Sequence, residues 1–257
     1  MIALERQNQI IEKLRIDKIV SVHDLAKQFN TTDMTIRRDL AALERKGLIT
    51  RSYGGAIFNE KVGYESEFVT RQSEKREIKS MLGKRAASLV TPGDSIGIDI
   101  GTTALEVAKH IRDVPDLTVI TASIPVINEL STANDINIIC TGGELSVKDM
   151  SLNGHTAVNM LQDYVLDKMF IGVAGISFDH GFTVFNMQDA LVKRVLIERS
   201  LEVIAIAHSD KIGLARYASV CNVEAVNKII TDSGISDEDL RNFESFGVEV
   251  IVVGNPE

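Results

Sequence analysis

Residues 31–56 read TTDMTIRRDLAALERKGLITRSYGGA, and this stretch decides the fold of the N-terminal part of the chain. Successive residues of a helix are turned by about 100°, so Ile36 and Leu40 fall on one apolar side of a helix formed here. Arg37 and Arg38 then point outward. Two adjacent outward arginines fit an ordinary solvated charged face, and the flanking sequence must decide whether they do more.

The flanking residues predict two further helices and a hairpin around this helix. Residues 3–16 carry apolar side chains at helical spacing, and Ser21 can cap a short helix over residues 22–29. A threonine or aspartate among residues 31–33 can cap the next helix, and two β-prone runs around Gly54 predict a hairpin. Three helices followed by such a wing are the layout of a winged helix-turn-helix domain.

In that layout the helix that follows residues 31–33 lies in the major groove of DNA. Its outward residues Thr35, Arg38 and Met34 would face base edges. Arg37 and the wing residues Arg51 and Tyr53 are placed to reach phosphates or an adjacent groove. An arginine suits either role, because it can grip guanine or pair with a phosphate, and the sequence does not assign the roles. The candidate DNA-contacting residues are Thr32, Met34, Thr35, Arg37, Arg38, Arg51, Tyr53 and Gly54.

The charge is distributed unevenly along the chain. Residues 1–58 hold ten lysines and arginines against seven aspartates and glutamates, a net charge of +3, although the whole chain carries −8. Residues 59–257 hold 18 basic against 29 acidic residues, a net charge of −11. A small basic segment joined to a large acidic one suggests that only the first part approaches a phosphate backbone.

Composition excludes several classes of protein. With 257 residues, of which 44% are hydrophobic and 25% charged, the chain is expected to fold into more than one globular domain. It shows no signal peptide and no apolar run of membrane-spanning length, so we expect a cytoplasmic protein with no membrane partner. Cys140 and Cys221 stand apart and lack metal-ligand spacing, and no motif predicts a metal or a cofactor.

The second part of the chain has the pattern of an α/β domain. Residues 59–72 lack a strong period and are expected to form a linker between domains spanning residues 1–58 and 73–257. Beyond the linker, helical stretches alternate with apolar runs at 95–100, 117–121, 136–140, 168–175, 203–208, 227–231 and 248–253. Strands this apolar belong to a largely parallel sheet that is covered by helices on both faces.

Ligands of such sheets bind outside the carboxyl ends of the strands, where small residues and hydroxyls recur in this chain. The turn Gly101-Thr102-Thr103 offers backbone N–H groups and a helix N-terminus that suit a phosphate. The candidate ligand-binding residues are Asp99, Gly101, Thr102, Thr103, Thr121, Ser123, Gly142, Gly143, Lys193 and Lys211. Glycine and threonine also turn chains for purely structural reasons, and Lys193 also fits an exposed helix face.

Nearly the whole chain resembles one family. TIRRDLAALERKGLITRSYGGA is similar to the N-terminal signature of the DeoR family of bacterial transcription regulators. SIGIDIGTTALEVAKHI, LTVITAS, GGEL, KMFIGVAGI, DALVKR and HSDKIG resemble successive motifs of its C-terminal sensor domain. The resemblance implies an oligomeric repressor that binds double-stranded operator DNA of a carbohydrate or polyol catabolic operon and is relieved by a phosphorylated sugar.

The family's sensor domain is similar in fold to ribose-5-phosphate isomerase, which makes an isomerase-like enzyme the alternative reading. Ala174 and His208 stand where that comparison expects aspartates, and isomerisation requires a carboxylate base near the substrate carbon. We therefore expect a sensor with no catalytic residue. A third hypothesis is an interaction protein whose N-terminal helices bind another protein, which failure to bind DNA at low salt would favour.

Overall fold

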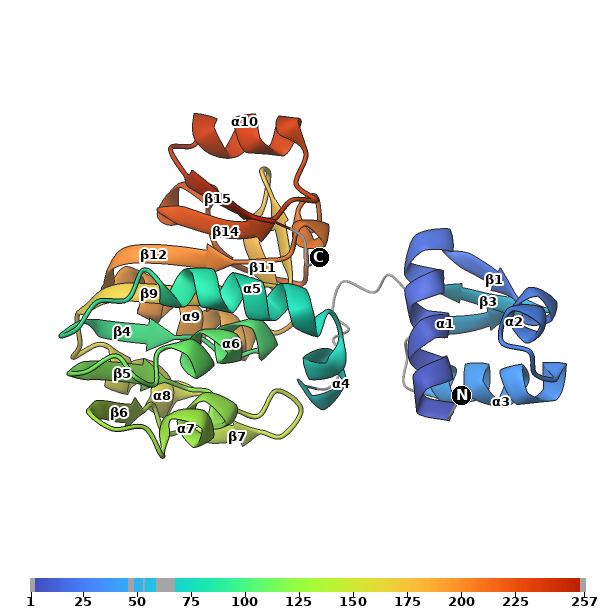
Figure 1. Cartoon of the computed structure of the whole chain (residues 1–257), viewed down its shortest axis with the longest axis horizontal. Coiled ribbons are helices and arrows are strands. Elements are labelled where there is room, and N and C mark those ends of the chain that lie inside the picture. Colours follow the sequence, from blue (N-terminus) through green and yellow to red (C-terminus); the bar gives the residue numbers. More distant parts are fainter. Residues whose placement is uncertain (1–2, 46–48, 53, 59–67, 255–257) are drawn as a thin grey trace. The chain divides into compact units, whose positions relative to one another are not determined.

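The computed structural model describes residues 3–45, 49–52, 54–58 and 68–254 (Figure 1). The chain divides into two compact units, Met1–Tyr64 and Glu65–Glu257, and each is described by itself. Within the described ranges, no helix combines the length and the apolar character that crossing a membrane requires.

The first unit is a three-helix domain with a small antiparallel sheet. Its strands lie in the order β1-β3-β2, so β1, which the sequence did not predict, completes the sheet of the wing. The elements are α1 (Ala3–Asp17), β1 (Ile19–Ser21), α2 (Val22–Gln28), α3 (Asp33–Arg45), β2 (Ile49–Ser52) and β3 (Gly55–Phe58). Among the three candidate caps of α3, Thr32 is the one whose hydroxyl accepts from a helix amide, that of Thr35, at 3.2 Å.

A buried ionic contact ties α1 to α3 in this unit. Asp39 is 4% exposed, and its carboxylate accepts hydrogen bonds from Arg6 at 2.6 Å and from Gln7 at 3.0 Å. The apolar core around it draws on all three helices and the sheet, including Leu14, Leu25 and Leu43. The carboxylate therefore depends on α1 for its hydrogen bonds.

We expect Asp39→Ala to lower the free energy of unfolding of the first unit by about 3 kcal/mol, because Arg6 then stays largely buried without this carboxylate. Urea unfolding of the full-length protein, followed by circular dichroism, measures this loss. The control is Asp17→Ala, which removes the exposed pair with Lys13 at 3.0 Å and is expected to cost under about 0.5 kcal/mol. Equal losses in the two variants would contradict the structural role of Asp39.

The second unit is built on a seven-stranded sheet in the order β15-β14-β12-β9-β4-β5-β6, in which every neighbouring pair is parallel. The strands are β4 (Ser95–Ile98), β5 (Leu117–Thr121), β6 (Ile136–Cys140), β9 (Leu166–Gly172), β12 (Ser200–Ile206), β14 (Lys228–Asp232) and β15 (Glu249–Val253). Each contains or overlaps an apolar run that the sequence analysis identified. The predicted α/β fold with a largely parallel sheet is confirmed.

Helices cover both faces of this sheet. The chief helices are α5 (Arg76–Ala87), α6 (Thr102–His110), α7 (Ile124–Leu130), α8 (His155–Leu161), α9 (Met187–Glu198) and α10 (Asp237–Ser245). Consecutive residues of β9 join opposite cores, with Phe170 packing with α5 and α6, and Met169 and Ile171 with α8 and α9. In Figure 1, α5 and α6 lie in front of the strands and α9 lies behind them. This double burial explains why the runs are apolar without alternation.

The order of the strands reverses between β4 and β9. From β4 the chain adds β5 and β6 on one side, and then β9, β12, β14 and β15 on the other. The carboxyl ends of β4 and β9 therefore flank a topological switch point. In open α/β sheets, ligands bind in the crevice at such a point.

Several short elements were not predicted from the sequence. A hairpin of β7 (Glu144–Ser146) and β8 (Ser151–Asn153) follows β6, and β10 (Gly175–Ser177), β11 (Gly181–Val184) and β13 (Ala218–Cys221) form a separate antiparallel sheet. Most are too short for an alternating pattern to stand out.

The end of the expected linker is helical. Residues 68–72 belong to α4 (Phe68–Ser73), so the expectation that they form part of a linker is wrong at this end. Phe68 is 3% exposed in the core that α5 and α6 share, and its amide donates to the carbonyl of Lys148 at 3.1 Å. The remainder of the expected linker, residues 59–67, lies outside the described residues.

Candidate functional sites

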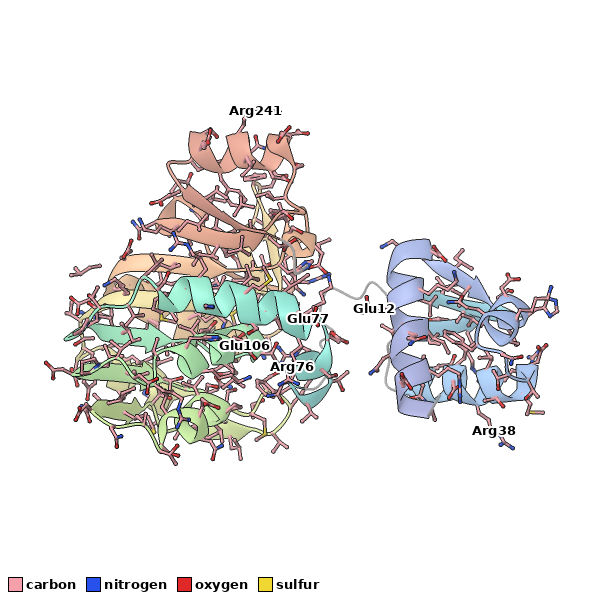
Figure 2. The ribbon with its side chains drawn as sticks, in the orientation of Figure 1. Glu12, Arg38, Arg76, Glu77, Glu106 and Arg241 are labelled. Carbon is pink, nitrogen blue, oxygen red and sulfur yellow. The ribbon has the colours of Figure 1, made fainter. Side chains whose placement is uncertain are left out.

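The outward side of α3 presents the residues that the sequence placed against DNA. Arg37 and Arg38 are exposed and Met34 is 62% exposed, whereas Ile36 on the other side is fully buried. Figure 2 shows the Arg38 side chain extending from α3 away from the other elements of its unit. Thr35 is half-buried, and its hydroxyl lies 3.0 Å from that of Thr32. The helix thus offers an exposed surface held on a rigid apolar base.

The wing residues are fixed by contacts that the sequence did not reveal. Arg51 donates from Nε to Glu44 Oε2 at 2.6 Å and from its backbone to Glu44 Oε1 at 3.1 Å. The side-chain hydrogen bond from Arg51 lowers the pKa of Glu44. The carbonyl of Gly54, whose φ is +89°, accepts from Val22 at 2.8 Å and joins the wing to α2. Tyr53 lies outside the described residues.

Asp99 stands at the switch point and joins the ends of its two strands. It directly follows β4, is 2% exposed, and accepts from the amide of Gly172 at the end of β9 at 2.7 Å. Lys193, 1% exposed, donates to the same carboxylate and lies 3.1 Å from Asp189. Burial lowers the pKa of Lys193, but Asp189 and Asp99 outweigh it and hold that pKa above its ordinary value. The reading of Lys193 as an exposed helix residue is therefore wrong.

The turn after Asp99 leaves the N-terminus of α6 open. Gly101 precedes the helix with a φ of +109°, and among the described residues no atom lies within 4 Å of where a Cβ would stand. No side chain of these residues caps the helix there. Thr102 is buried and Thr103 half-buried in its first turn. Uncapped N–H groups with the positive end of the helix dipole favour an anion.

The candidate residues after β5 and β6 make hydrogen bonds and contacts within the chain. The hydroxyl of Thr121 donates to the carbonyl of Ile98 at 2.6 Å, and Ser123 caps α7 through Val126 at 3.3 Å. A Cβ at Gly143 would lie 2.2 Å from the carbonyl oxygen of Asn153, so only glycine fits there. Gly142 has a φ of +65° in the same turn. These residues shape the edge of the sheet.

Cationic side chains gather around Lys79 of α5, among them Lys211, which is half-buried in the turn η1 (Ser209–Lys211) after β12. Burial is the largest cause that lowers the pKa of Lys79; the charge of Glu74 opposes it, the charges of Lys211, Arg71 and Lys75 add to it, and the resulting pKa is about 8. Lys75 donates to Asp210 at 2.6 Å. Sequence reasoning missed Arg71, Lys75 and Lys79, because they come from α4, α5 and the junction between them rather than from a strand end.

A row of polar contacts leads from α4 to the switch point. Arg71 lies 3.2 Å from Asp149, which is 4% exposed. Asn186 donates to Asp149 at 3.5 Å and caps α9 by accepting from the amide of Asp189 at 2.7 Å. This polar row consists of Arg71, Asp149, Asn186, Asp189, Lys193 and Asp99.

Two positions bear on the enzyme alternative. Ala174 is buried and contributes only backbone groups, its amide donating to Thr183 at 3.0 Å and its carbonyl accepting from Arg216 at 3.3 Å. His208 Nδ1 lies 2.9 Å from Asp210, and its Nε2 lies 3.6 Å from Asp232. The histidine is thus held between two carboxylates, and residue 174 supplies no ionisable group.

The two cysteines are free thiols, and burial raises the pKa of Cys221 to about 12. Among the described residues, no cluster of three or more histidine, cysteine, aspartate or glutamate side chains is arranged to hold a metal ion.

Comparison with known proteins agrees with both units. The chain is 32% identical to a putative aga operon transcriptional repressor of Escherichia coli O157:H7, over 97% of this chain and 94% of that protein. It is 29% identical to the glycerol-3-phosphate regulon repressor of Escherichia coli K12, over 89% of this chain and 90% of the relative.

Among solved structures, ribose 5-phosphate isomerase A of Methanocaldococcus jannaschii matches 54% of this chain and 55% of its own, with 14% identity and a TM-score of 0.40. A likeness this distant carries no functional argument, and the curated relatives are named as regulators rather than enzymes.

Two family models cover most of the sequence. The model of the DeoR-like helix-turn-helix domain matches residues 6–62, and that of the DeoR C-terminal sensor domain matches residues 74–233. The resemblance noted in the sequence is thereby confirmed, and the isomerase-like enzyme and the pure interaction protein are set aside. The chain belongs to the DeoR family of DNA-binding transcriptional regulators.

Proposed function

We propose that the protein represses a carbohydrate or polyol catabolic operon and is released from its operator by a phosphorylated sugar or polyol. The observation that carries the effector part of the proposal is the open N-terminus of α6 at Gly101, at the switch point of the sheet. Its amides and dipole suit a phosphate group. The relative named after a glycerol-3-phosphate regulon supports effectors of this chemical class.

The cationic cluster adds to this argument. Arg71, Lys75, Lys79 and Lys211 bring positive charge to a unit of strongly acidic composition. A local concentration of cations selects an anion despite the overall negative charge. In the proposed site, Gly101, Thr102 and Thr103 hold the phosphate and Lys211 attracts it. Asp99 and Lys193 fix the ends of the strands, and Thr121, Ser123, Gly142 and Gly143 shape the edge.

DNA binding is proposed to use the exposed side of α3 and the wing. Thr32, Met34, Thr35 and the two arginines of α3 face the major groove, while Arg51, Tyr53 and Gly54 approach the backbone. Regulators with this motif commonly bind paired half-sites as dimers, so the active form is proposed to be a homo-oligomer.

The effector must bind two conformations of the protein unequally, since only differential affinity shifts the population that binds DNA. A coupling of about 1–3 kcal/mol is typical. We propose that the polar row carries this coupling, because it joins Asp99 at the switch point to Arg71 on α4. In the sequence, α4 comes directly after the residues that connect the two units.

Fluorescence anisotropy of a labelled fragment from upstream of the protein's own operon tests the proposal. The complex is challenged with phosphorylated sugars and polyols and with each unphosphorylated parent. Release by one phosphate and not by its parent is the expected result. Binding that no phosphate reverses would overturn the effector part, and absence of binding would overturn the operator part.

The cationic cluster predicts a pH dependence of effector affinity. Because the pKa of Lys79 is about 8, its charge is present below pH 8 and is lost as the pH rises through 8. Phosphate esters lose their second proton near pH 6 and keep a constant charge in this range. Affinity for the releasing phosphate, measured by calorimetry, is expected to fall between pH 7.5 and 9, by at most about tenfold per pH unit.

Lys79→Met should flatten this fall, whereas Lys84→Met, which alters an exposed lysine of the same helix, should leave it unchanged. An affinity that stays constant from pH 7.5 to 9 in the unmodified protein would remove Lys79 from the site.

A further inference from the structure

Asn153, at the end of β8, has a buried polar atom without a partner. The side chain belongs to a residue that is 6% exposed, and its Nδ2 donates to the hydroxyl of Ser151 at 3.0 Å. Its Oδ1 is buried and accepts no hydrogen bond from any described residue. Turning the amide over would exchange the two atoms and leave Nδ2 unpaired instead. Buried polar side-chain groups rarely lack a hydrogen-bond partner in folded proteins, so we expect this amide to bind a partner from outside the chain.

The position of Asn153 places it at the proposed effector site. A bridge pairs Ser151 with Ser123, and the amide of Leu152 donates to the carbonyl of Ala122 at 2.8 Å, so Asn153 lies opposite Thr121. Alternate residues of extended chains share a side, which puts the side chains of Thr121, Ser123, Ser151 and Asn153 together. The backbone of Asn153 also packs against Gly143.

Each of the neighbouring hydroxyl oxygens has at least one hydrogen-bond partner within the chain. Thr121 donates to Ile98 and accepts from the amide of Ser123, and the hydroxyl of Ser123 accepts from Val126. Ser151 accepts from Asn153. Within this group of side chains, Asn153 is the one with a buried polar atom that has no hydrogen-bond partner among the described residues.

The missing partner has a definite chemistry. In the orientation of the structure Oδ1 requires a donor, which a phosphate oxygen does not supply; a phosphate oxygen would fit only the turned amide, whereas a hydroxyl both donates and accepts and satisfies either orientation. On the basis of the proposed function, we infer that Asn153 is a specificity-determining residue that hydrogen-bonds one hydroxyl of the sugar or polyol part of the effector. In this arrangement the turn at Gly101 binds the phosphate group, and Asn153 recognises a hydroxyl on the carbon chain of the same effector.

The test uses calorimetry on the full-length protein with glycerol 3-phosphate, glucose 6-phosphate, galactose 6-phosphate, mannose 6-phosphate and fructose 6-phosphate. Inorganic phosphate serves as the probe without hydroxyls on carbon. Asn153→Ala is expected to lower the affinity for the preferred sugar or polyol phosphate at least about tenfold. The differences in affinity among the five sugar and polyol phosphates should also become smaller, because a site that hydrogen-bonds a substrate hydroxyl discriminates strongly. The affinity of the Asn153→Ala variant for inorganic phosphate should stay within about twofold of that of the unmodified protein.

Asn153→Ser repeats the test with a smaller polar side chain, and Asn159→Ala, an exposed asparagine of α8, is the matched control that should change nothing. An unaltered order of preference in both Asn153 variants would overturn the inference and mean that a buried water satisfies the amide. The inference would also be overturned if the Asn153 variants bound sugar phosphates and inorganic phosphate with equally reduced affinity and had a lower melting temperature. That result would show that Asn153 has a structural role. An unmodified protein that binds no sugar or polyol phosphate overturns the proposed function itself, a result seen without any variant.

Discussion

Replacing Arg38 by alanine is expected to lower the affinity for operator DNA by roughly 10- to 100-fold and the affinity for random DNA far less. Arg38 extends from the exposed side of α3, the helix that the winged helix-turn-helix layout places in the major groove (Figure 2). A bidentate contact between an arginine and guanine is worth about 1–3 kcal/mol of discrimination. Fluorescence anisotropy with operator and scrambled fragments at one salt concentration measures both affinities.

Arg51→Ala supplies the comparison for this prediction. Glu44 of α3 holds the guanidinium of Arg51 on the wing, and the wing is the part that we propose to contact the phosphate backbone. The loss of Arg51 is therefore expected to weaken operator and random DNA about equally and to reduce the salt slope by about one. If both variants lost the same factor on both fragments, the base-reading role of Arg38 would be refuted.

Gly101→Val is expected to reduce the affinity for the releasing phosphate by about 100-fold or more while leaving operator affinity unchanged. The side chain would enter the open space before α6, where the phosphate is proposed to bind, and would cover the free amides. Gly101 also has a φ of +109° and a ψ of 165°, a conformation that almost only glycine adopts, so a residue with a Cβ costs about 1–3 kcal/mol there. Calorimetry of the effector and anisotropy of the operator complex separate the two effects.

Gly247→Val controls for the backbone strain in this experiment. Gly247 has a φ of +77°, and no described atom lies within 4 Å of where its Cβ would stand. Both variants place a β-branched side chain at a positive φ, but only Gly101 precedes α6. A loss of effector affinity in both would show that strain, rather than a blocked anion site, causes the effect.

The fold was predictable wherever one signal dominated locally. Ser21 caps α2 as expected. The seven apolar runs form the seven parallel strands, because strands that are buried on both faces consist almost entirely of hydrophobic residues. Residues 68–72 were misjudged because Phe68 is their principal apolar anchor, and its burial depends on helices distant in sequence. Three-residue strands such as β8 are set by pairing with neighbours rather than by their own pattern.

The candidate sites were also predictable only in part: residues at strand ends could be identified from the sequence, whereas contacts between distant segments could not. A strand end can be read from the sequence, which is why Asp99 and Gly101 were found at the switch point. The engaged hydroxyl of Thr121, the paired carboxylates around Lys193 and the unpartnered amide of Asn153 depend on contacts between segments far apart in the chain. Such contacts leave no periodic trace, so sequence reasoning listed residue types and could not say which atoms were still available.

The polar row also determines where this regulator can be cut and rejoined. A chimaera that takes its sensor from this chain at residue 73 would leave behind Arg71 and Phe68, which removes the ion pair of the buried Asp149 carboxylate and opens a cavity in the apolar core. A junction placed before Phe68 keeps both with the unit that they stabilise. The transplantable sensor therefore begins at α4, and exchanging DNA-binding modules upstream of that helix preserves the contacts that we propose to carry the coupling.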